Sequence, residues 1–339
     1  MALSARAARS RVRGAEPARP SLREVVRFAE SDDGQRLALA EVSAPDAAPV
    51  ARGPAFLLLH GFAQNRRSFT LGPLPAALLA RGARVFLGEL RGHGESRVAG
   101  RRAWDLRTHL ELDCPALLAG VRREARAERV HLIGHSMGGL LGCALLAGDA
   151  PLASLTAVAT PILLGAGRPL VRLASLLAGP FATIAPKHHR VPVDRLLALL
   201  ARPLSRADAR GPARWLQRAM RLANPAVAGP EALRAVLANA DAESPAVFEE
   251  LARNAVFARP RIAGVDLVEA LRASRLPVAA VVGTRDVFAP RAAVAPMDAP
   301  GHAGPRLVVE LPGVTHIDVV IGHHVPDTVA RLWEFLAPR

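Results

Sequence analysis

The stretch VHLIGHSMGGLLGCALL, residues 130–146, decides the fold. It begins with an apolar run typical of a buried strand and ends in small and apolar residues that suit a helix. The pentapeptide Gly-His-Ser-Met-Gly at residues 134–138 joins the two parts. A strand that turns sharply into a helix through Gly-x-Ser-x-Gly holds its serine in a strained, exposed position at the tip of a sheet. The sequence therefore predicts a strand–turn–helix unit that presents Ser136.

Further apolar runs, each short enough to be a buried strand, alternate with segments of helical length. The predicted strands are residues 55–59, 84–87, 130–133, 155–160, 277–283 and 306–311, and the predicted helices among them are 74–80, 103–127 (interrupted near Pro115) and 327–336. Such alternation favours the α/β class, with a mostly parallel sheet covered by helices on both faces. An antiparallel hairpin is predicted ahead of it, with strands at 25–29 and 36–42 around a Gly-containing turn.

The alternation stops between residues 164 and 274. Helices are predicted there at 193–201, 213–222, 230–239 and 245–255, separated by Pro and Gly breaks. An all-helical insertion between two sheet strands is the simplest interpretation. We therefore divide the chain into a disordered basic leader (1–21), the first part of an α/β core (22–163), a helical cap insertion (164–274) and the second part of the core (275–339).

The composition limits the classes of partner. Half of the 339 residues are hydrophobic, as in a globular enzyme and unlike a disordered protein. The formal charge of +14 comes mostly from scattered Arg, since Lys187 is the single lysine. No basic stripe with interleaved aromatic residues is present, so we predict no nucleic-acid partner. The excess charge is either solvated surface or a weak attraction to an anionic membrane surface.

The termini, the cysteines and the histidine pairs carry little chemistry. Residues 1–20 lack the apolar core of a signal peptide and read as a transit peptide or, preferably, a disordered leader. The best apolar run, 173–186, is too short for a membrane span and contains two prolines, so we expect a cytoplasmic protein. Cys143 is predicted to be a small buried hydrophobe. The pairs 188–189 and 323–324 lack further ligands at metal spacing, and we predict neither metal nor cofactor.

A serine hydroxyl needs a base to become a nucleophile, and that base is usually an imidazole oriented by a carboxylate. Asp286 directly follows the predicted strand 277–283, and His316 directly follows the predicted strand 306–311. Because active sites of parallel sheets gather at the carboxyl ends of the strands, we expect Ser136, Asp286 and His316 to meet. Taken alone, Asp286 could be a turn or cap residue and His316 an ordinary loop histidine. Their common placement favours catalysis.

With these features the chain resembles the serine hydrolases of the α/β-hydrolase fold, of the capped esterase and lipase kind. The resemblance covers nearly all of residues 22–339, although the insertion matches only in kind. It rests on residues 60–62 (HGF), 91–96 (RGHGES), 134–139 (GHSMGG), 283–286 (GTRD) and 313–316 (GVTH). It implies that Ser136 is the nucleophile, His316 the general base and acid, and Asp286 the orienting carboxylate.

Acyl transfer also needs two N–H donors for the oxyanion. The backbone of Met137, directly after the serine at a helix N-terminus, is predicted to supply one. The resemblance implies that the N–H of Phe62 supplies the other, although His60-Gly61 could also be an ordinary tight turn. Among the other polar residues, His60 and His93 are predicted to tie loops together, and Asp318 to cap a helical turn.

The predicted function is metal-independent hydrolysis of carboxylic esters through an acyl-enzyme. The Leu- and Ala-rich insertion favours a small-molecule ester with an apolar acyl chain as the substrate. Two alternatives stay open. The same triad supports acyl transfer or another reaction of this fold, and the fold also occurs in binding proteins without catalysis.

Overall fold

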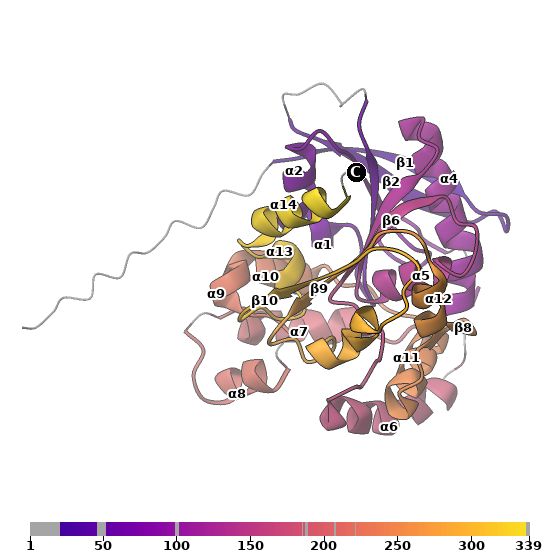
Figure 1. Cartoon of the computed structure of the whole chain (residues 1–339). Coiled ribbons are helices and arrows are strands. Elements are labelled where there is room, and N and C mark those ends of the chain that lie inside the picture. Colours follow the sequence, from indigo (N-terminus) through magenta and orange to yellow (C-terminus); the bar gives the residue numbers. More distant parts are fainter. Residues whose placement is uncertain are drawn as a thin grey trace, which may run out of the picture.

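The computed structural model describes residues 21–45, 52–98, 102–184, 186, 189–206, 208–220 and 222–336. Its centre is an open eight-stranded sheet with the strand order β1-β2-β4-β3-β5-β6-β9-β10 (Figure 1). The strands are β1 (Arg23–Glu30), β2 (Arg36–Ser43), β3 (Ala55–Leu59), β4 (Arg84–Gly88), β5 (Val130–His135), β6 (Leu152–Val158), β9 (Val278–Gly283) and β10 (Arg306–Leu311). The predicted leader lies outside the described residues, apart from Ser21.

The pairing of the strands confirms the predicted fold class. From β4 through β10 every neighbouring pair is parallel, while the β1–β2 hairpin and the pairing of β2 with β4 are antiparallel. All five residues of β3 are buried, as expected for a strand covered on both faces. Along β3, Leu57 and Leu59 contact one core cluster while Phe56 and Leu58 contact the other, which follows the two-residue period of a strand.

Helices cover both faces of the sheet. One core cluster includes residues of α4 (Cys114–Ala125), α5 (Met137–Leu145) and α12 (Leu267–Ala273). The other includes residues of α2 (Leu74–Leu79), α13 (Asp318–Ile321) and α14 (Val325–Leu336), with the short α1 (Arg67–Thr70) nearby. Cys143 is a buried free thiol in α5, as predicted.

The predicted interruption near Pro115 is a π-helical turn just before that residue and not a break in the helix. The chain is continuously helical from α3 (Leu106–Thr108) through a π-helical turn (His109–Asp113) into α4. Pro115 occupies the first turn of α4, directly after the wider turn. A proline ring clashes with the carbonyl four residues before it, and an i→i+5 turn relieves that crowding without ending the helix.

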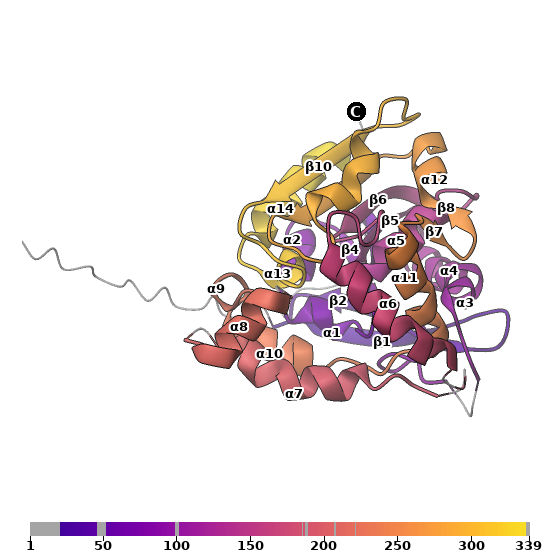
Figure 2. The same cartoon turned by 90° about the horizontal axis from the view of Figure 1, so that it is seen from below.

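Helices α6 to α11, which follow β6 in the chain, are gathered at one end of the sheet (Figures 1 and 2). They are α6 (Pro169–Ile184), α7 (Val193–Ser205), α8 (Gly211–Met220), α9 (Pro225–Ala228), α10 (Pro230–Ala238) and α11 (Pro245–Phe257). We call this group the cap. Its limits at residues 164 and 274 stay a prediction.

The expectation of an all-helical insertion is wrong in one detail. Strands β7 (Arg261–Ile262) and β8 (Val265–Asp266) form a small antiparallel ladder after α11. Ala263 and Gly264 join them, both with positive φ (52° and 88°), as in the two-residue turns that suit hairpins. Two-residue strands are too short to give a periodic signal in the sequence. In the described part of the chain, no helix has both the length and the apolar character needed to cross a membrane.

Candidate active site

The turn between β5 and α5 is built by close backbone approach. Ser136 has φ 51° and ψ −113°, a conformation that costs a non-glycine residue about 1–3 kcal/mol. A Cβ on Gly134 would collide with the backbone of Gly138, and one on Gly138 would collide with the carbonyl oxygens of Leu59 and His60. The two glycines therefore allow the strand, the helix and the neighbouring loop to converge on the serine.

The structure brings the three predicted triad side chains into one chain of hydrogen bonds. Nε2 of His316 lies 3.1 Å from Oγ of Ser136, and Nδ1 of His316 lies 2.8 Å from Oδ2 of Asp286. Each residue follows the carboxyl end of its own parallel strand: β5, β9 and β10 respectively. This spacing permits proton transfer between the hydroxyl and the imidazole.

The environment of Asp286 keeps it ionised. Its side chain is fully buried, and its Oδ1 accepts the N–H groups of Phe288 (2.8 Å) and Ala289 (2.9 Å). Burial alone would raise the pKa of Asp286, but the facing His316 and the backbone donors hold that pKa below its usual value. A carboxylate can only accept, so Nδ1 of His316 carries a proton. In the neutral ring, Nε2 is then free to accept the proton of the Ser136 hydroxyl.

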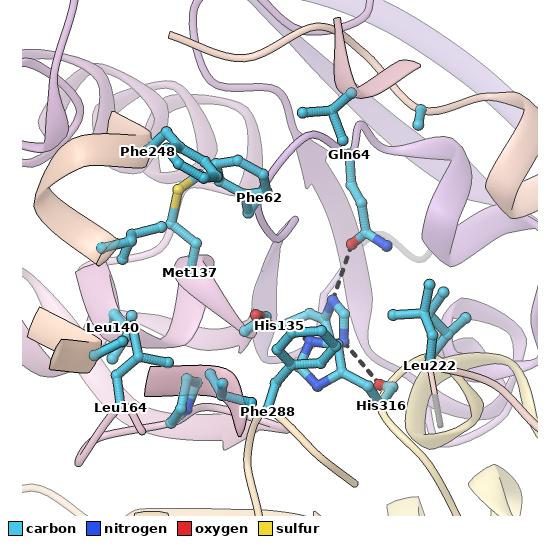
Figure 3. A pocket seen from close by; sticks show the side chains of 18 of the residues that line it. Phe62, Gln64, His135, Met137, Leu140, Leu164, Leu222, Phe248, Phe288 and His316 are labelled. Atoms are coloured by element: carbon cyan, nitrogen blue, oxygen red, sulfur yellow. Dashed lines mark hydrogen bonds between the residues drawn. The ribbon is translucent and has the colours of Figure 1, made fainter. Parts of the chain in front are cut away.

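A second imidazole, His135, supports the loop that carries His316. Burial, reinforced by His316, lowers the pKa of His135 to about 3, so this ring is neutral. Nε2 of His135 donates to the backbone carbonyl of His316 at 3.1 Å, which leaves Nδ1 as an acceptor. Nδ1 lies 3.0 Å from Oε1 of Gln64 (Figure 3), so the neutral ring requires this amide to turn by 180° and place its NH₂ group toward Nδ1.

The two predicted oxyanion donors both lie next to the serine. Met137 is the first residue of α5, and Phe62 belongs to the loop after β3. A Cβ on the adjacent Gly61 would be only 3.1 Å from Cβ of Ser136, so this loop passes directly beside the serine. Within the described residues, the N–H groups of Phe62 and Met137 have no protein acceptor. Both are therefore available to an oxygen bound at Ser136.

A cavity of about 300 Å³ opens at Ser136 (Figure 3). In the figure, Phe62, Met137 and Phe248 line one side, while Gln64 and His316 lie on the other. Helices α6, α7, α10 and α11 of the cap contribute mostly aliphatic side chains to its wall, for example Val171, Leu197, Val236 and Leu251. An extended apolar group can therefore be held next to the polar atoms of Ser136 and His316.

His60 joins two loops, as predicted. Its Nδ1 donates to the carbonyl of Gly61 at 2.9 Å, and its Nε2 accepts the N–H of Leu90 at 3.1 Å. Burial holds the pKa of His60 well below its usual value, so the ring stays neutral. His93 likewise joins residues that are far apart in the sequence, because its two ring nitrogens face the carbonyl of Arg91 and the carboxylate of Glu243.

The prediction that Asp318 caps a helical turn is wrong. Asp318 is the first residue of α13, but its carboxylate turns away from that helix. It accepts the N–H and the hydroxyl of Thr315, at 3.1 and 2.7 Å, and the N–H of Asn224 in the cap at 3.0 Å. These donors, which precede α13 in the chain, occupy the carboxylate, so it does not cap the helix. Asp318 thereby holds Thr315, the residue before His316, in place.

Sequence reasoning missed Glu243, which is fully buried in the cap segment between α10 and α11 and bonds to the loop after β3. One acidic residue within a helical insertion carries no motif that could have revealed it. For metal binding, no group of three or more His, Cys, Asp or Glu among the described residues has suitable geometry. His188 of the first histidine pair lies outside the described residues.

Comparisons with known proteins agree with this architecture. A family described as "alpha/beta hydrolase fold" matches residues 54–320. A comparison with curated proteins gave no significant match. Among solved structures, the chain is similar to a hydrolase from Pseudomonas aeruginosa PA01 (21% identity, TM-score 0.58, covering 92% of this chain and 98% of that one).

Two other similar structures are named by their activities. A thermophilic esterase from Thermogutta terrifontis has 19% identity and a TM-score of 0.57, with 93% of this chain and 100% of that chain covered. The enol-lactonase from Burkholderia xenovorans LB400 has 20% identity and a TM-score of 0.57, with 92% and 100% covered. At these identities the likeness concerns the fold. Because the family match spans most of its length, the chain belongs to the α/β-hydrolase fold family.

Proposed function

We propose that the protein is a serine hydrolase that cleaves carboxylic esters through an acyl-enzyme. The observation that carries this proposal is the continuous hydrogen-bonded series Ser136–His316–Asp286 at the wall of an apolar cavity. Family membership and the esterase and lactonase names of similar structures support it. A cavity that combines a base-activated serine with free backbone N–H donors has the parts that acyl transfer requires.

In the proposed first half-reaction, Oγ of Ser136 attacks the ester carbonyl while Nε2 of His316 takes its proton. Asp286 stabilises the resulting imidazolium and holds the ring in place. The N–H groups of Phe62 and Met137 bind the oxyanion of the tetrahedral intermediate. Collapse of the intermediate breaks the C–O bond, and the imidazolium gives its proton to the departing alcohol.

In the second half-reaction, water attacks the acyl-enzyme carbonyl as His316 takes a proton from that water. The same two N–H groups hold the second oxyanion. Collapse then releases the carboxylic acid and returns the proton to Oγ of Ser136. No cofactor enters either half-reaction.

The lining of the cavity indicates the substrate. Apart from Ser136 and His316, few polar side chains face the cavity, chiefly Gln64, His135 and Ser175. Burial of apolar surface contributes about 0.8 kcal/mol for each CH₂ group. We therefore propose a small-molecule ester with an apolar acyl chain rather than a polar one.

A series of p-nitrophenyl esters from acetate to decanoate tests this function. The wild type is expected to hydrolyse them with a kcat/KM that rises beyond acetate, and Ser136→Ala is expected to lose the activity. Full activity of Ser136→Ala, or preference for polar acyl groups, would contradict the proposal. Product analysis with an added alcohol acceptor separates hydrolysis from acyl transfer, and a wild type without turnover would favour a binding protein.

The outer side of the cap motivates one proposal about partners, a weak attraction to an anionic membrane surface. Leu176 and Leu177 on α6 and Leu199 on α7 are more than half exposed. Arginines such as Arg195 and Arg202 are exposed on α7 as well. We expect co-sedimentation with vesicles rich in phosphatidylglycerol that salt weakens, and none with pure phosphatidylcholine. Equal binding to both vesicles would contradict an electrostatic attraction.

A further inference from the structure

The loop after β3, which carries Phe62, makes a strained turn at the next residue. Ala63 has φ +53°, a left-handed conformation that L residues rarely adopt, and it is fully buried. A strained residue keeps such a conformation only where its surroundings fix it. The conformation of Ala63 sets the direction of the backbone beside Phe62, and therefore the direction of the N–H proposed to bind the oxyanion.

The contacts that fix Ala63 come from the cap. Its N–H donates to Oε2 of Glu243 at 3.1 Å, and its carbonyl accepts the N–H of Asp241 at 2.9 Å. Nδ2 of the nearby Asn65 lies 2.8 Å from Oδ2 of Asp241 and 2.8 Å from the carbonyl of Asn239. The segment 239–243, which joins α10 to α11, therefore holds this loop from both sides.

Glu243 is itself rigidly placed. It is fully buried, and its Oε1 accepts the N–H of Ser244 at 2.8 Å. Its backbone pairs with that of Val191 through two hydrogen bonds of 2.8 and 3.0 Å. Oε2, the atom that accepts from Ala63, also lies 3.2 Å from Nε2 of His93. Both carboxylate oxygens are thus occupied by donors.

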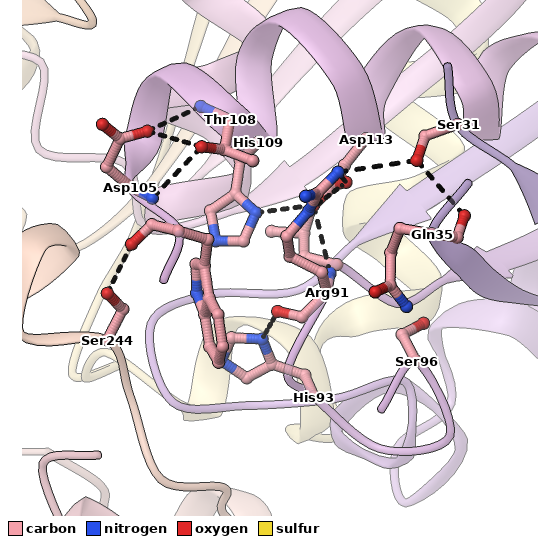
Figure 4. A network of polar contacts seen from close by, with 12 residues as sticks. Ser31, Gln35, Arg91, His93, Ser96, Asp105, Thr108, His109, Asp113 and Ser244 are labelled. Atoms are coloured by element: carbon pink, nitrogen blue, oxygen red, sulfur yellow. Dashed lines mark hydrogen bonds and ion pairs between the residues drawn. The ribbon is translucent and has the colours of Figure 1, made fainter. Parts of the chain in front are cut away.

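The geometry of His93 requires a doubly protonated ring. Its Nδ1 lies 3.1 Å from the carbonyl of Arg91, which can only accept, and its Nε2 faces the carboxylate of Glu243 (Figure 4 shows the Arg91 side of this contact). Two acceptors at the two nitrogens leave the imidazolium as the form that satisfies both. The other ionisable groups around the ring are Asp241, which also attracts it, and the imidazoles of His60 and His109.

The expected pKa values agree with this geometry. Burial would lower the pKa of His93, but the charge of Glu243 raises it above its usual value overall. Burial would likewise raise the pKa of Glu243, yet the facing His93 lowers it to about 2. The neighbouring His60 stays neutral, so it adds no competing positive charge. The pair is a buried imidazolium–carboxylate ion pair.

We propose that Glu243, held by the His93 imidazolium, is a positioning residue of the oxyanion hole. It fixes the backbone of Ala63 and thereby aims the N–H of Phe62. This inference rests on the proposed ester hydrolysis. It gives the cap a second role, because the cap supplies the buried acceptor that orders a catalytic loop of the core in addition to lining the cavity.

A nearby buried acid offers a matched control. Asp113 is fully buried, lies 2.8 Å from Nδ1 of His109 and accepts Nε of Arg91 at 2.8 Å (Figure 4). Its hydrogen bonds among the described residues go to Arg91 and His109 and not to the loop after β3. Asp113→Asn therefore perturbs a buried His–acid contact of the same kind without touching Ala63.

The decisive comparison is Glu243→Gln against Asp113→Asn. The amide keeps the size of the side chain but cannot accept from Ala63, Ser244 and His93 together. Removal of a whole oxyanion donor costs about 10²–10³-fold in kcat, so we expect misplacement of one to lower kcat about 10- to 100-fold with KM changed less than about threefold. Affinity for an alkyl boronic acid, which forms a tetrahedral adduct on serine, should fall by the same factor as kcat.

Asp113→Asn should lose thermal stability but keep kcat and boronic acid affinity close to wild type. Equal kcat losses in the two variants, or a Glu243→Gln variant altered in KM alone, would overturn the proposal. A wild type without ester hydrolysis and without boronic acid binding would instead refute the proposed function. The two failures are therefore distinguishable.

Substitutions of His93 keep the proposal testable if Glu243→Gln does not fold. Gln at this position places an amide donor close to the former Nε2, whereas Ala removes it. We expect His93→Gln to retain several-fold more kcat than His93→Ala, and equal values would contradict the proposal. In the wild type, ¹⁵N NMR of labelled histidines should show one ring with both nitrogens protonated at pH 7.5, absent from His93→Gln. A spectrum that shows only neutral histidine rings at that pH would also overturn the proposal.

Discussion

The loops after β3 and after β10 reach Ser136 from opposite sides, and a buried carboxylate connects each of them to the cap. On the β3 side, Glu243 of the cap accepts from Ala63 in the core. On the β10 side the direction is reversed, because Asp318 of the core accepts from Asn224 in the cap and from Thr315, the residue before His316. Both carboxylates are fully buried, yet their partners differ in charge.

That difference sets the two acids apart. Glu243 faces the imidazolium of His93, and although burial opposes ionisation its pKa is lowered to about 2. The described donors to Asp318 are all neutral, so burial, with a contribution from the charge of Asp286, raises its pKa to about 6. Between these two acids, the facing cation of Glu243 is the main difference that separates the two pKa values. The carboxylate of Glu243 should therefore stay ionised near neutrality, whereas that of Asp318 titrates.

The largest expected effect comes from replacing the two triad residues that act on Ser136, His316 and Asp286. His316→Ala should lower kcat for p-nitrophenyl butyrate by about 10⁴–10⁶-fold, because the serine loses its base. Asp286→Asn should cost about 10⁴-fold, since an amide does not hold the required tautomer of His316. Steady-state kinetics measure both losses. A loss below tenfold in either variant would remove that residue from the site.

The next effect distinguishes Asp318 from Glu243. The two acids should change the free energy of unfolding with opposite signs as the pH rises. The pKa of Asp318 is raised on folding, so its stabilisation is present below pH 4 and is lost as the pH rises through about 6. Asparagine does not titrate. Between pH 4 and pH 7 the free energy of unfolding of the wild type should therefore fall relative to Asp318→Asn by about 2 kcal/mol.

Glu243 should behave in the opposite way. Its pKa is lowered on folding, so its contribution is present above pH 4.5 and is lost as the pH falls toward 2. Urea unfolding of the wild type, Asp318→Asn and Glu243→Gln across this range gives both slopes. The same sign for the two acids would contradict the difference in their partners.

The smallest expected effect concerns a single hydrogen bond on the β10 side. Thr315→Val keeps the shape of the side chain and removes the hydroxyl that donates to Asp318 at 2.7 Å. We expect a loss of about 1 kcal/mol in stability and a change in kcat of less than about fivefold, because the N–H of Thr315 still holds the loop. Urea unfolding and steady-state kinetics at pH 7.5 measure these changes. A loss of kcat as large as that of Asp286→Asn would show that the loop depends on this bond alone.

The sequence predicts those parts of the site that local pattern determines. Ser136, Asp286 and His316 each follow a strand of the parallel part of the sheet, and parallel strands deliver their carboxyl ends to one edge. The glycines around Ser136 mark the close approach of strand and helix. Strand periodicity and these turn residues are short-range signals, so the fold class and the meeting of the three side chains were both predictable.

The contacts that brace this site were not predictable in the same way. Glu243 and Ala63 are 180 residues apart, and no local pattern links a single acid in a helical segment to a distant turn. The sequence predicts that Asp318 caps a helical turn, but its carboxylate accepts instead from Thr315 and from Asn224 of the cap. Long-range polar contacts depend on how the cap sits on the core, and hydrophobic periodicity contains no information about that.

The most direct measurement of the central claim is covalent labelling of the serine. The wild type should react with a fluorophosphonate probe at pH 7.5, and peptide mass spectrometry should locate one adduct on Ser136, with His316→Ala reacting much more slowly. An unlabelled wild type, or an adduct on another residue while Ser136 stays unmodified, would contradict the account.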